Sequence, residues 1–324
     1  MRSPLSPDVL QYLVAITELG SIRRAAERLN ISPSALNRQI LNLEQRIGTR
    51  LFDREARGMK PTRSGEIILA AAKEFERSVT EALEQVGTLR GLGSGRVSFG
   101  TLTTFAETFT GPLVVRIRKQ HPQLRISYYS GNSADIVHKV LEGNLDFGLC
   151  WDPPMSTPIS CLVSVEVPVG VAMRPDHPLA KKSHVRLRDC LEHPVVFPSR
   201  GMEFRSVLDR INVGIGNVIS PAIESNSIAF LRRICVAGGD PVMMTANSVL
   251  DEIESGALAF RPLSDPSCGQ LMLSLFKRDG AATSAASQAL LDALRAEVSD
   301  LQKRFSRVIA KGNSARARPG ARKA

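Results

Sequence analysis

Apolar side chains recur every three or four positions in three short segments near the start of the chain. Residues 8–19 show this spacing first, residues 22–29 repeat it over a shorter length with two adjacent alanines, and a third segment runs from Pro33 to about Arg46. Because this spacing places apolar side chains on one face of a helix, the pattern predicts three helices. The small alanine side chains let the second helix approach a neighbour closely.

The third of these helices has a polar face that packing does not require. Its apolar positions are expected in the core: Ala35, Leu36, Ile40, Leu43 and Ile47. Its polar positions are expected to face outward: Ser34, Asn37, Arg38, Asn42 and Gln45. A tight turn at Asn30 and Ile31 precedes it, and Ser32 is a good N-cap. Two short helices joined in this way are typical of a helix-turn-helix, whose second helix enters the major groove of DNA.

The residues after the third helix have the pattern of a small hairpin. Gly48 ends the helix, an apolar Leu51-Phe52 pair follows, and Gly58 lies at the expected tip before Pro61. The pattern predicts a two-stranded wing that carries three basic side chains, Arg54, Arg57 and Lys60.

Residues 65–90 repeat apolar side chains at alternating steps of four and three. The repeating positions are Ile68, Ala72, Phe75, Val79, Ala82, Val86 and Leu89. A heptad pattern of this kind predicts a long helix that pairs with another helix, and a coiled-coil dimer is the favoured interpretation. The alternative is a helix that packs against its own chain.

The remainder of the chain alternates between strand and helix patterns. After a glycine-rich hinge at 91–95, strands are predicted at 96–101, 124–129 and 145–151, with helices at 109–120 and 133–141. This order predicts a parallel sheet. From about Val165 a second lobe follows, with strands at 167–173, 194–197 and 242–245 and helices at 204–210, 227–237 and 248–254.

A last helix is predicted from apolar side chains spaced by three and four, namely Leu291, Leu294, Val298, Leu301, Phe305 and Val308. We expect it to cover the first lobe, in preference to pairing with a partner. Residues 311–324 are rich in Arg, Ala and Gly and are expected to be disordered.

The basic charge of the chain lies at its two ends. The formal net charge is +10, residues 1–66 carry 11 basic and 7 acidic side chains, and residues 303–324 carry 8 basic and no acidic ones. Basic ends indicate a polyanionic partner, although a basic tail alone is also explained by solubility. No apolar run is long enough to span a bilayer, and the N-terminus lacks the apolar region of a signal peptide, so we expect a cytoplasmic protein without a membrane partner.

The sequence motifs give little support for a metal site or for catalysis. The five cysteines at 150, 161, 190, 235 and 268 form no metal-binding spacing, and we expect buried or half-buried free thiols. The five histidines are scattered, and phosphate-binding, nucleophile-elbow and zinc-protease motifs are absent. We therefore expect no metal, no cofactor and no enzymatic activity.

Residues 19–65 closely resemble the N-terminal signature of LysR-type transcriptional regulators. The shared elements include Gly20-Ser21, Ala25-Ala26, Arg38-Gln39-Ile40, Leu43-Glu44 and Gly48-Thr49-Arg50-Leu51-Phe52. Looser similarity continues through Leu141-Glu142-Gly143-Asn144-Leu145-Asp146 and Asp176-His177-Pro178-Leu179-Ala180. The resemblance covers roughly residues 8–302.

The resemblance implies a multidomain α+β fold: a winged helix-turn-helix, a long linker helix, and a two-lobed α/β effector domain similar to periplasmic binding proteins. The expected parts are the winged helix-turn-helix at 1–62, the dimerisation helix at 63–90, the hinge at 91–95, lobe I at 96–164 and 266–302, lobe II at 165–265, and the helix end with the basic tail at 303–324. It also implies a homodimer or homotetramer on an imperfect dyad in promoter DNA, a small-molecule effector between the lobes, and RNA polymerase as a further partner.

DNA contacts are expected from ten side chains. They are Ser21, Arg23, Ser32, Pro33, Ser34, Asn37, Arg38, Arg54, Arg57 and Lys60. Asn37 stands where the family more often has Ser, and an Asn can make a bidentate contact to adenine, so we predict an adenine preference there. Arg38 is expected to hold a phosphate, and the wing residues are expected to hold the flanking backbone or to enter the minor groove.

Effector contacts are expected where strands end and helices begin. The predicted residues are Thr101, Thr103, Thr104, Asn132, Ser133, Ser199, Arg200 and Thr245. A plain capping role is the alternative for each Ser or Thr. Pro241 departs from the family pattern before the strand at 242–245, so the effector of a relative does not transfer to this chain.

Two other functions compete with a specific regulator. A solute-binding protein would need an export signal and no helix-turn-helix, which the first 65 residues oppose. A sequence-independent DNA binder would show no large ratio of specific to non-specific affinity.

Overall fold

The structure is a computed structural model of the chain. It describes residues 6–55, 58–89, 95–154, 156–182, 184–215, 221–268, 271–281 and 283–314.

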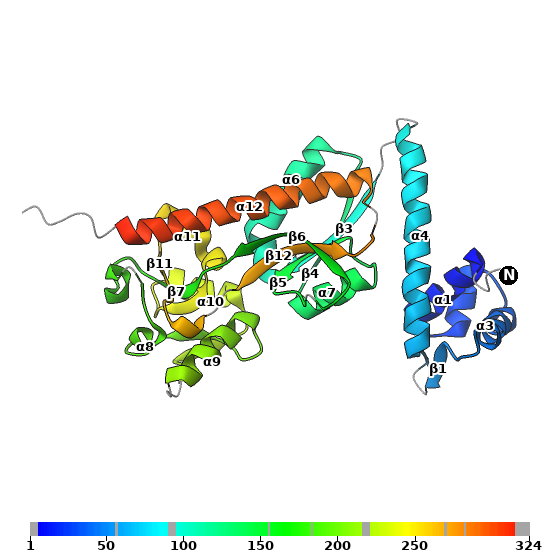
Figure 1. Cartoon of the computed structure of the whole chain (residues 1–324), viewed down its shortest axis with the longest axis horizontal. Helices are drawn as coiled ribbons and strands as arrows, with labels where there is room; N and C mark the ends of the chain where they lie inside the picture. The colour runs from blue at the N-terminus through cyan, green and yellow to red at the C-terminus, as the bar shows by residue number, and fades with distance from the viewer. Residues whose placement is uncertain are drawn as a thin grey trace, which may run out of the picture.

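Three short helices and a hairpin form the N-terminal unit (Figure 1). They are α1 (Pro7–Leu19), α2 (Ile22–Leu29), α3 (Pro33–Ile47), β1 (Phe52–Glu55) and β2 (Gly58–Pro61). The three helices end in residues with left-handed backbone, Gly20, Asn30 and Gly48, as the turn positions predict. The core of this unit includes both alanines of α2 and the apolar face of α3. The helix-turn-helix and the wing are therefore both present.

The hairpin is held against the helices by close backbone contacts. Gly58, at φ +127°, lies so near α1 that a Cβ added to it would stand 2.3 Å from the Gly20 carbonyl oxygen. The Met59 N–H donates to that same oxygen at 2.9 Å. From α3, the Glu44 carboxylate accepts hydrogen bonds from the Leu51 N–H at 2.7 Å and the Phe52 N–H at 3.2 Å. These contacts fix the wing relative to α3.

The long helix α4 (Arg63–Leu89) packs against α1 through the N-terminal part of its heptad seam. Ala72 is buried there, but Phe75 and Val79 are 41% and 43% exposed in the single chain. Lys73 donates to Asn144 Oδ1 at 3.2 Å, and Glu74 pairs with Arg278, so α4 also contacts the first lobe of the α/β region. The side chains of Val86 and Leu89 and the hinge residues 91–94 lie outside the described residues.

The first α/β unit is built on a five-stranded sheet in the order β4-β3-β5-β12-β6. Its strands are β3 (Arg96–Leu102), β4 (Arg125–Gly131), β5 (Phe147–Trp151), β6 (Ile159–Glu166) and β12 (Met272–Arg278). The first three are parallel, as the alternation predicts, whereas β12 is antiparallel to both β5 and β6. Strands β6 and β12 were not among the strands expected from the sequence pattern.

The helices of this unit follow its parallel strands. After β3 come α5 (Thr103–Phe105), a π-helical turn η1 (Ala106–Thr110) and α6 (Gly111–Gln120), and after β4 comes α7 (Ser133–Leu141). The predicted helix at 109–120 was therefore too short, since helical structure begins at Thr103.

The second α/β unit has a five-stranded sheet in the order β11-β7-β10-β8-β9. Its strands are β7 (Val169–Met173), β8 (Val196–Pro198), β9 (Ile223–Ser225), β10 (Val242–Thr245) and β11 (Ala259–Pro262). Its helices are η2 (Pro178–Lys181), α8 (Leu187–Cys190), α9 (Glu203–Ile215), α10 (Ile228–Val236), η3 (Ala246–Val249), α11 (Leu250–Ser255) and η4 (Pro266–Cys268). The chain passes from the first sheet to the second between β6 and β7 and returns between β11 and β12.

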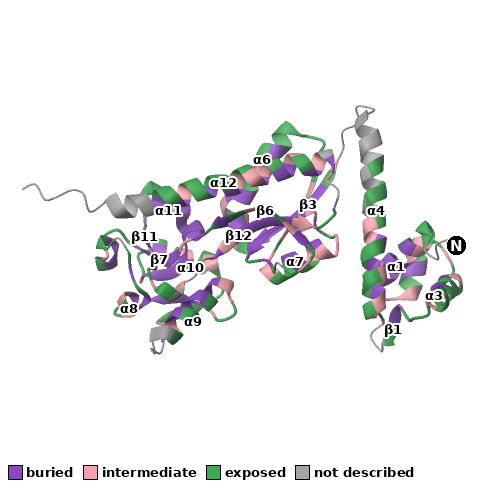
Figure 2. Ribbon diagram, in the orientation of Figure 1, coloured by how far each residue is buried: buried purple, intermediate pink, exposed green. Residues whose placement is uncertain are grey.

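The closing helix α12 (Ala285–Ser314) runs along both α/β units (Figures 1 and 2). It packs on β6, β3 and α6 of the first unit and on β11 and η3 of the second. We expected it to cover the first lobe, and it does so, but it also packs on the second unit, and its later apolar positions Leu301, Phe305 and Val308 are buried as well. It also continues to Ser314, so residues 311–314 are helical where we expected disorder. Residues 315–324 lie outside the described part of the chain.

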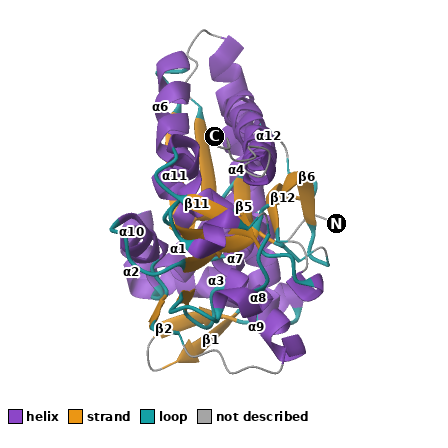
Figure 3. Cartoon of the chain, turned by 90° about the vertical axis from the view of Figure 1, so that its left-hand side faces the viewer, coloured by secondary structure: helices purple, strands orange, loops and turns teal. Residues whose placement is uncertain are grey.

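Helices flank the sheets in the turned view (Figure 3), and a buried apolar cluster extends through both units. No helix in the described part of the chain combines the length and apolar character needed to cross a membrane.

Candidate functional site

The exposed face of α3 presents the side chains expected to read DNA. Pro33, Ser34 and Arg38 are exposed and Asn37 is half-buried, while Leu36, Ile40 and Leu43 on the opposite face are buried. The N-cap Ser32 accepts a hydrogen bond from the Ala35 N–H at 3.2 Å. The first turn of α3 is thus both capped and open to a partner.

Asn37 and Arg54 are brought together by the fold. Arg54 Nη2, on the wing, donates to Asn37 Oδ1 at 2.7 Å. Sequence reasoning assigned the two side chains to different parts of the DNA, a base and the flanking backbone. In the structure they form one polar unit between α3 and β1, which orients the Asn37 amide.

Among the remaining side chains predicted to contact DNA, some already have hydrogen-bond partners within the domain and others are exposed. Ser21 caps α2 by accepting from the Arg24 N–H at 3.4 Å, and Arg23 pairs with Glu27 at 3.3 Å. Lys60 on β2 is exposed. Arg57 lies outside the described residues.

A cleft of about 620 Å³ separates the two α/β units. From the first unit it is lined by Thr103, Thr104, Asn132 and neighbours at the ends of β3 and β4, and from the second by Arg200, Thr245 and the starts of α9 and α10. Five of the eight predicted effector residues therefore line one cavity.

Several polar groups of the cleft are held by local hydrogen bonds. Ser130 Oγ donates to Thr103 Oγ1 at 3.2 Å, and Asn132 Oδ1 caps α7 by accepting from the Asp135 N–H at 2.8 Å. Thr245 is 2% exposed, and its hydroxyl lies 3.0 Å from that of Ser248. These groups are oriented before a ligand arrives.

The other three predicted effector residues do not line the cleft. Thr101 is buried, and its hydroxyl lies 2.7 Å from Tyr128 Oη. The Ser199 N–H donates to the Ser225 carbonyl at 2.9 Å. The backbone of Ser133 faces the second unit, while its side chain contacts the Cys150 thiol, whose pKa is raised to about 12 chiefly by burial.

One hydrogen bond crosses the cleft. Glu203 Oε1, at the start of α9, accepts from the Ser133 N–H at the start of α7 at 3.1 Å. A carboxylate at a helix N-terminus is favoured by the unpaired N–H groups and the helix dipole. Glu203 therefore links the two units in the conformation described.

Sequence reasoning missed most of the cleft's walls. Tyr129, Trp151 and Phe204 supply aromatic surface, and Asp135 and Glu203 supply carboxylates. Tyr129 and Trp151 lie at the ends of predicted strands, and this position could have indicated that they line the cleft. Glu203 and Phe204 open α9, which the sequence located without showing what it faces. Within the described residues, no group of three or more His, Cys, Asp or Glu side chains could hold a metal ion.

Two family profiles match the chain. Residues 7–66 match "Bacterial regulatory helix-turn-helix protein, lysR family", and residues 90–299 match "LysR substrate binding domain". Among curated proteins, the transcriptional regulator BbuR of Bordetella bronchiseptica is 27% identical over 86% of this chain and 86% of its own length. The regulator CbbR of Sinorhizobium medicae is 27% identical over 85% of this chain and 88% of its own.

Solved structures show the same fold over about nine-tenths of this chain. A full-length OxyR variant of Pseudomonas aeruginosa superposes with a TM-score of 0.66 at 21% identity, covering 90% of this chain and 95% of its own. LysG of Corynebacterium glutamicum, solved with bound effector Arg, gives 0.65 at 17% identity, covering 91% and 99%. Full-length CbnR in complex with its target DNA gives 0.54 at 18% identity, covering 90% and 99%.

The helix-turn-helix, the two-lobed α/β region and the two family profiles agree. The chain belongs to the LysR family of bacterial transcriptional regulators, with an N-terminal DNA-binding domain and a C-terminal effector-binding domain, and it is a regulator rather than an enzyme.

Proposed function

We propose that the protein reads an imperfect dyad in promoter DNA with two copies of α3 and reports the occupancy of its cleft through α4. The observation that carries the proposal is the presence in one chain of an open, polar α3 face and a cleft of about 620 Å³ between two lobes. The solved complexes of CbnR with target DNA and of LysG with an effector support it by fold.

Sequence is read, in this proposal, by the first turns of α3. Ser34 and Asn37 face the bases, while Arg38 and Lys60 hold phosphates and set the position of the domain. Ser21, Arg23, Ser32, Pro33, Arg54 and Arg57 complete the contact surface. Phosphate contacts should make the affinity strongly dependent on salt.

Two copies pair through the exposed seam of α4. Phe75 and Val79 lie on the heptad positions and are unburied in the single chain, which is the arrangement expected of a helix that pairs with a partner. A twofold dimer would present two α3 helices to a dyad site, and a tetramer would double that contact. RNA polymerase is a further proposed partner at promoters that the protein activates.

The effector is proposed to bind in the cleft, against Thr103, Thr104, Asn132, Arg200 and Thr245. Thr101, Ser133 and Ser199 then act through hydrogen bonds that position the walls. We assign lobe I to 96–164 and 266–302 and lobe II to 165–265, with the DNA-binding domain at 1–62, the dimerisation helix at 63–90, the hinge at 91–95 and the tail at 303–324. The protein would work in the cytoplasm, where its DNA lies.

The test combines two measurements on the full chain. A thermal-shift screen of metabolites should find a ligand that raises the melting temperature, because a ligand that binds only the folded form stabilises it. DNA footprinting with and without that ligand should then show protection of one promoter segment and a change in its extent. Footprints that stay the same with a confirmed ligand would refute the coupling.

A further inference from the structure

A second, smaller cavity lies between the lobes, with no lining residue in common with the effector cleft. Its volume is about 30 Å³. Lobe I contributes Phe105, Thr108 and Phe109, α12 contributes Leu301 and Arg304, and lobe II contributes the remaining wall from α10, η3 and α11. The cavity is thus the place where both lobes and the closing helix meet.

Asn247 is the exceptional residue of this cavity. It is 2% exposed, it lines the cavity, and neither its Oδ1 nor its Nδ2 has a hydrogen-bond partner among the residues that the structure describes. A buried amide without hydrogen-bond partners destabilises the fold, because its polar atoms lose the hydrogen bonds that they make with water in the unfolded chain. A polar guest in the cavity would remove that cost.

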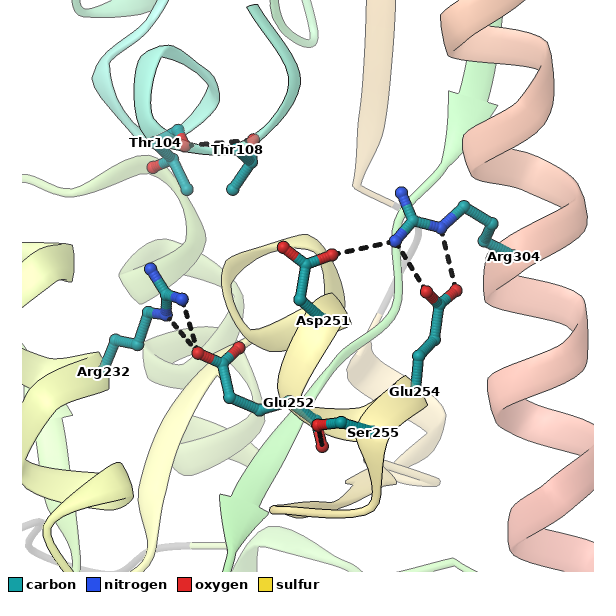
Figure 4. A network of polar contacts seen from close by, with 8 residues as sticks. All are labelled: Thr104, Thr108, Arg232, Asp251, Glu252, Glu254, Ser255 and Arg304. Carbon is teal, nitrogen blue, oxygen red and sulfur yellow. Dashed lines mark hydrogen bonds and ion pairs between the residues drawn. The ribbon is translucent and has the colours of Figure 1, made fainter. Parts of the chain in front are cut away.

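The charged side chains that line the cavity are held in ion pairs (Figure 4). Arg232 Nε donates to Glu252 at 2.7 Å. Arg304 makes two hydrogen bonds to Glu254, each 2.8 Å long, and one to Asp251 at 3.0 Å. Because these pairs are already formed, the guest need carry no charge.

Lobe I offers one polar side chain to the same space. The Thr108 hydroxyl donates within its own helix to the Thr104 and Phe105 carbonyls, both at 3.4 Å, so its oxygen remains able to accept a hydrogen bond. A guest that donates to Thr108 Oγ1 and to Asn247 Oδ1, and accepts from Asn247 Nδ2, would satisfy the amide and join the lobes. Water has this capacity, and 30 Å³ accommodates about two water molecules.

We propose that this cavity is a structural water site that bridges lobe I to lobe II through Asn247 and Thr108. The site is connected to the effector cleft, since Ser248 lines the cavity and its hydroxyl lies 3.0 Å from that of Thr245, which lines the cleft. An effector that takes the Thr245 hydroxyl would free the Ser248 hydroxyl to turn toward the cavity. The water site therefore adjoins the effector cleft through the contact between Thr245 and Ser248.

The experiment is a crystal structure of the full-length wild-type chain at a resolution that shows ordered water. We expect one or two density peaks within hydrogen-bond distance of both Asn247 amide atoms, one of them also at Thr108 Oγ1. In Asn247→Leu, which has a similarly branched but larger side chain without polar atoms, the peaks at residue 247 should disappear. The control is Asn226→Leu, an exposed cleft residue, which should leave them in place.

Three outcomes would overturn the assignment. They are a wild-type cavity without density at Asn247, an Asn247 amide bonded to protein atoms instead, and a peak whose short contacts to several oxygens identify a cation. Thr108→Val supplies a second variant if Asn247→Leu does not fold. In this variant the water should lose its contact to lobe I while the peak at Asn247 remains. If the contact to lobe I persists as well, the bridge is also contradicted.

Discussion

At the scale of single residues, the family signature reflects local geometry as much as DNA contact. Glu44 and Gly65 belong to the stretch that carries the resemblance, and both make close contacts with the backbone of the domain itself. Glu44 accepts two backbone hydrogen bonds that open the wing, and a Cβ on Gly65 would lie 2.0 Å from the Leu51 carbonyl oxygen. Such residues are fixed by backbone contacts that no periodicity can show.

Gly65→Ala should destabilise the DNA-binding domain. The added methyl group would meet a backbone oxygen that cannot move without the wing, so we expect a loss of about 1–3 kcal/mol, typical of overpacking. Thermal unfolding followed by circular dichroism measures it. Gly111→Ala is the matched control, because a Cβ there meets nothing within 4 Å. Equal melting temperatures for the two variants would show that the contact is relieved cheaply.

Asn37→Ser should relax the base preference at one position of the binding site. The Asn37 amide is oriented by Arg54 at 2.7 Å, and a bidentate contact from such an amide to adenine discriminates by about 1–3 kcal/mol. Binding-site selection on both proteins measures it. Arg54→Ala should weaken binding to all sequences and reduce the salt slope by about one, and it should also relax part of the adenine preference, because it removes the hydrogen bond that orients Asn37. An unchanged adenine frequency in the Asn37→Ser pool would refute base reading by Asn37.

The thiols should differ sharply in reactivity. We expected buried or half-buried cysteines, and Cys161 is instead exposed on β6. Burial raises the pKa of Cys150, Cys190 and Cys235 to about 12, so these thiols stay protonated and unreactive at neutral pH. Native titration with a thiol reagent should therefore give one fast group, Cys161, followed by slower Cys268. The control is Cys161→Ser, and a fast phase that survives in it would contradict this order.

At the scale of elements, most of the longer helices and six of the ten described strands of the α/β units could be predicted, whereas β6, β9, β11 and β12 could not. Strands β3, β4, β5, β7, β8 and β10 lie close to the predicted ranges. The predictions succeeded where a strand is followed by a helix pattern that marks its end. Strand β6 mixes buried and exposed positions without strict alternation, and β12 pairs with partners more than 100 residues earlier in the chain. Their pairing depends on long-range contacts that local pattern does not contain.

The residues of the candidate cleft were likewise predicted only in part. Its strand-end threonines and the α7 cap could be found, because polar residues after parallel strands meet at one edge of a sheet. Glu203, Asp135 and the aromatic walls could not, since their role depends on how the second lobe faces the first. The role of Asn247 could not be predicted from the sequence, because it depends on the absence of hydrogen-bond partners for its buried amide among the described residues.

The seam of α4 should control the oligomeric state. Replacing Phe75 and Val79 with Asp places charges where two helices would meet, and we expect sedimentation to show a shift from dimer or tetramer toward monomer. Ala70→Asp, at an exposed position on the face of α4 opposite the seam, is the control and should leave the assembly intact. A double variant that sediments like the wild type would assign the dimer to another surface.

At the scale of the whole molecule, the arrangement of the lobes depends on few contacts. The chain crosses between the sheets twice, α12 spans both lobes, and Arg304 fastens its later turns to α11. Across the mouth of the cleft, Glu203 accepts from the Ser133 N–H at 3.1 Å. An effector with an anionic group would compete with Glu203 for that N–H, since both occupy the positive end of α7.

Glu203→Ala should therefore shift the lobes toward a more open arrangement without effector. Removal of one charge-assisted hydrogen bond costs about 1.5–3 kcal/mol of the closed form, enough to change a two-state population by more than tenfold. Small-angle scattering, or energy transfer between dyes on the two lobes, measures the separation. Glu224→Ala is the control, because its carboxylate accepts from the Arg200 N–H within a single lobe. If both variants keep the wild-type separation, then the crossovers and α12 alone hold the lobes, and the effector must act by some route other than displacing Glu203.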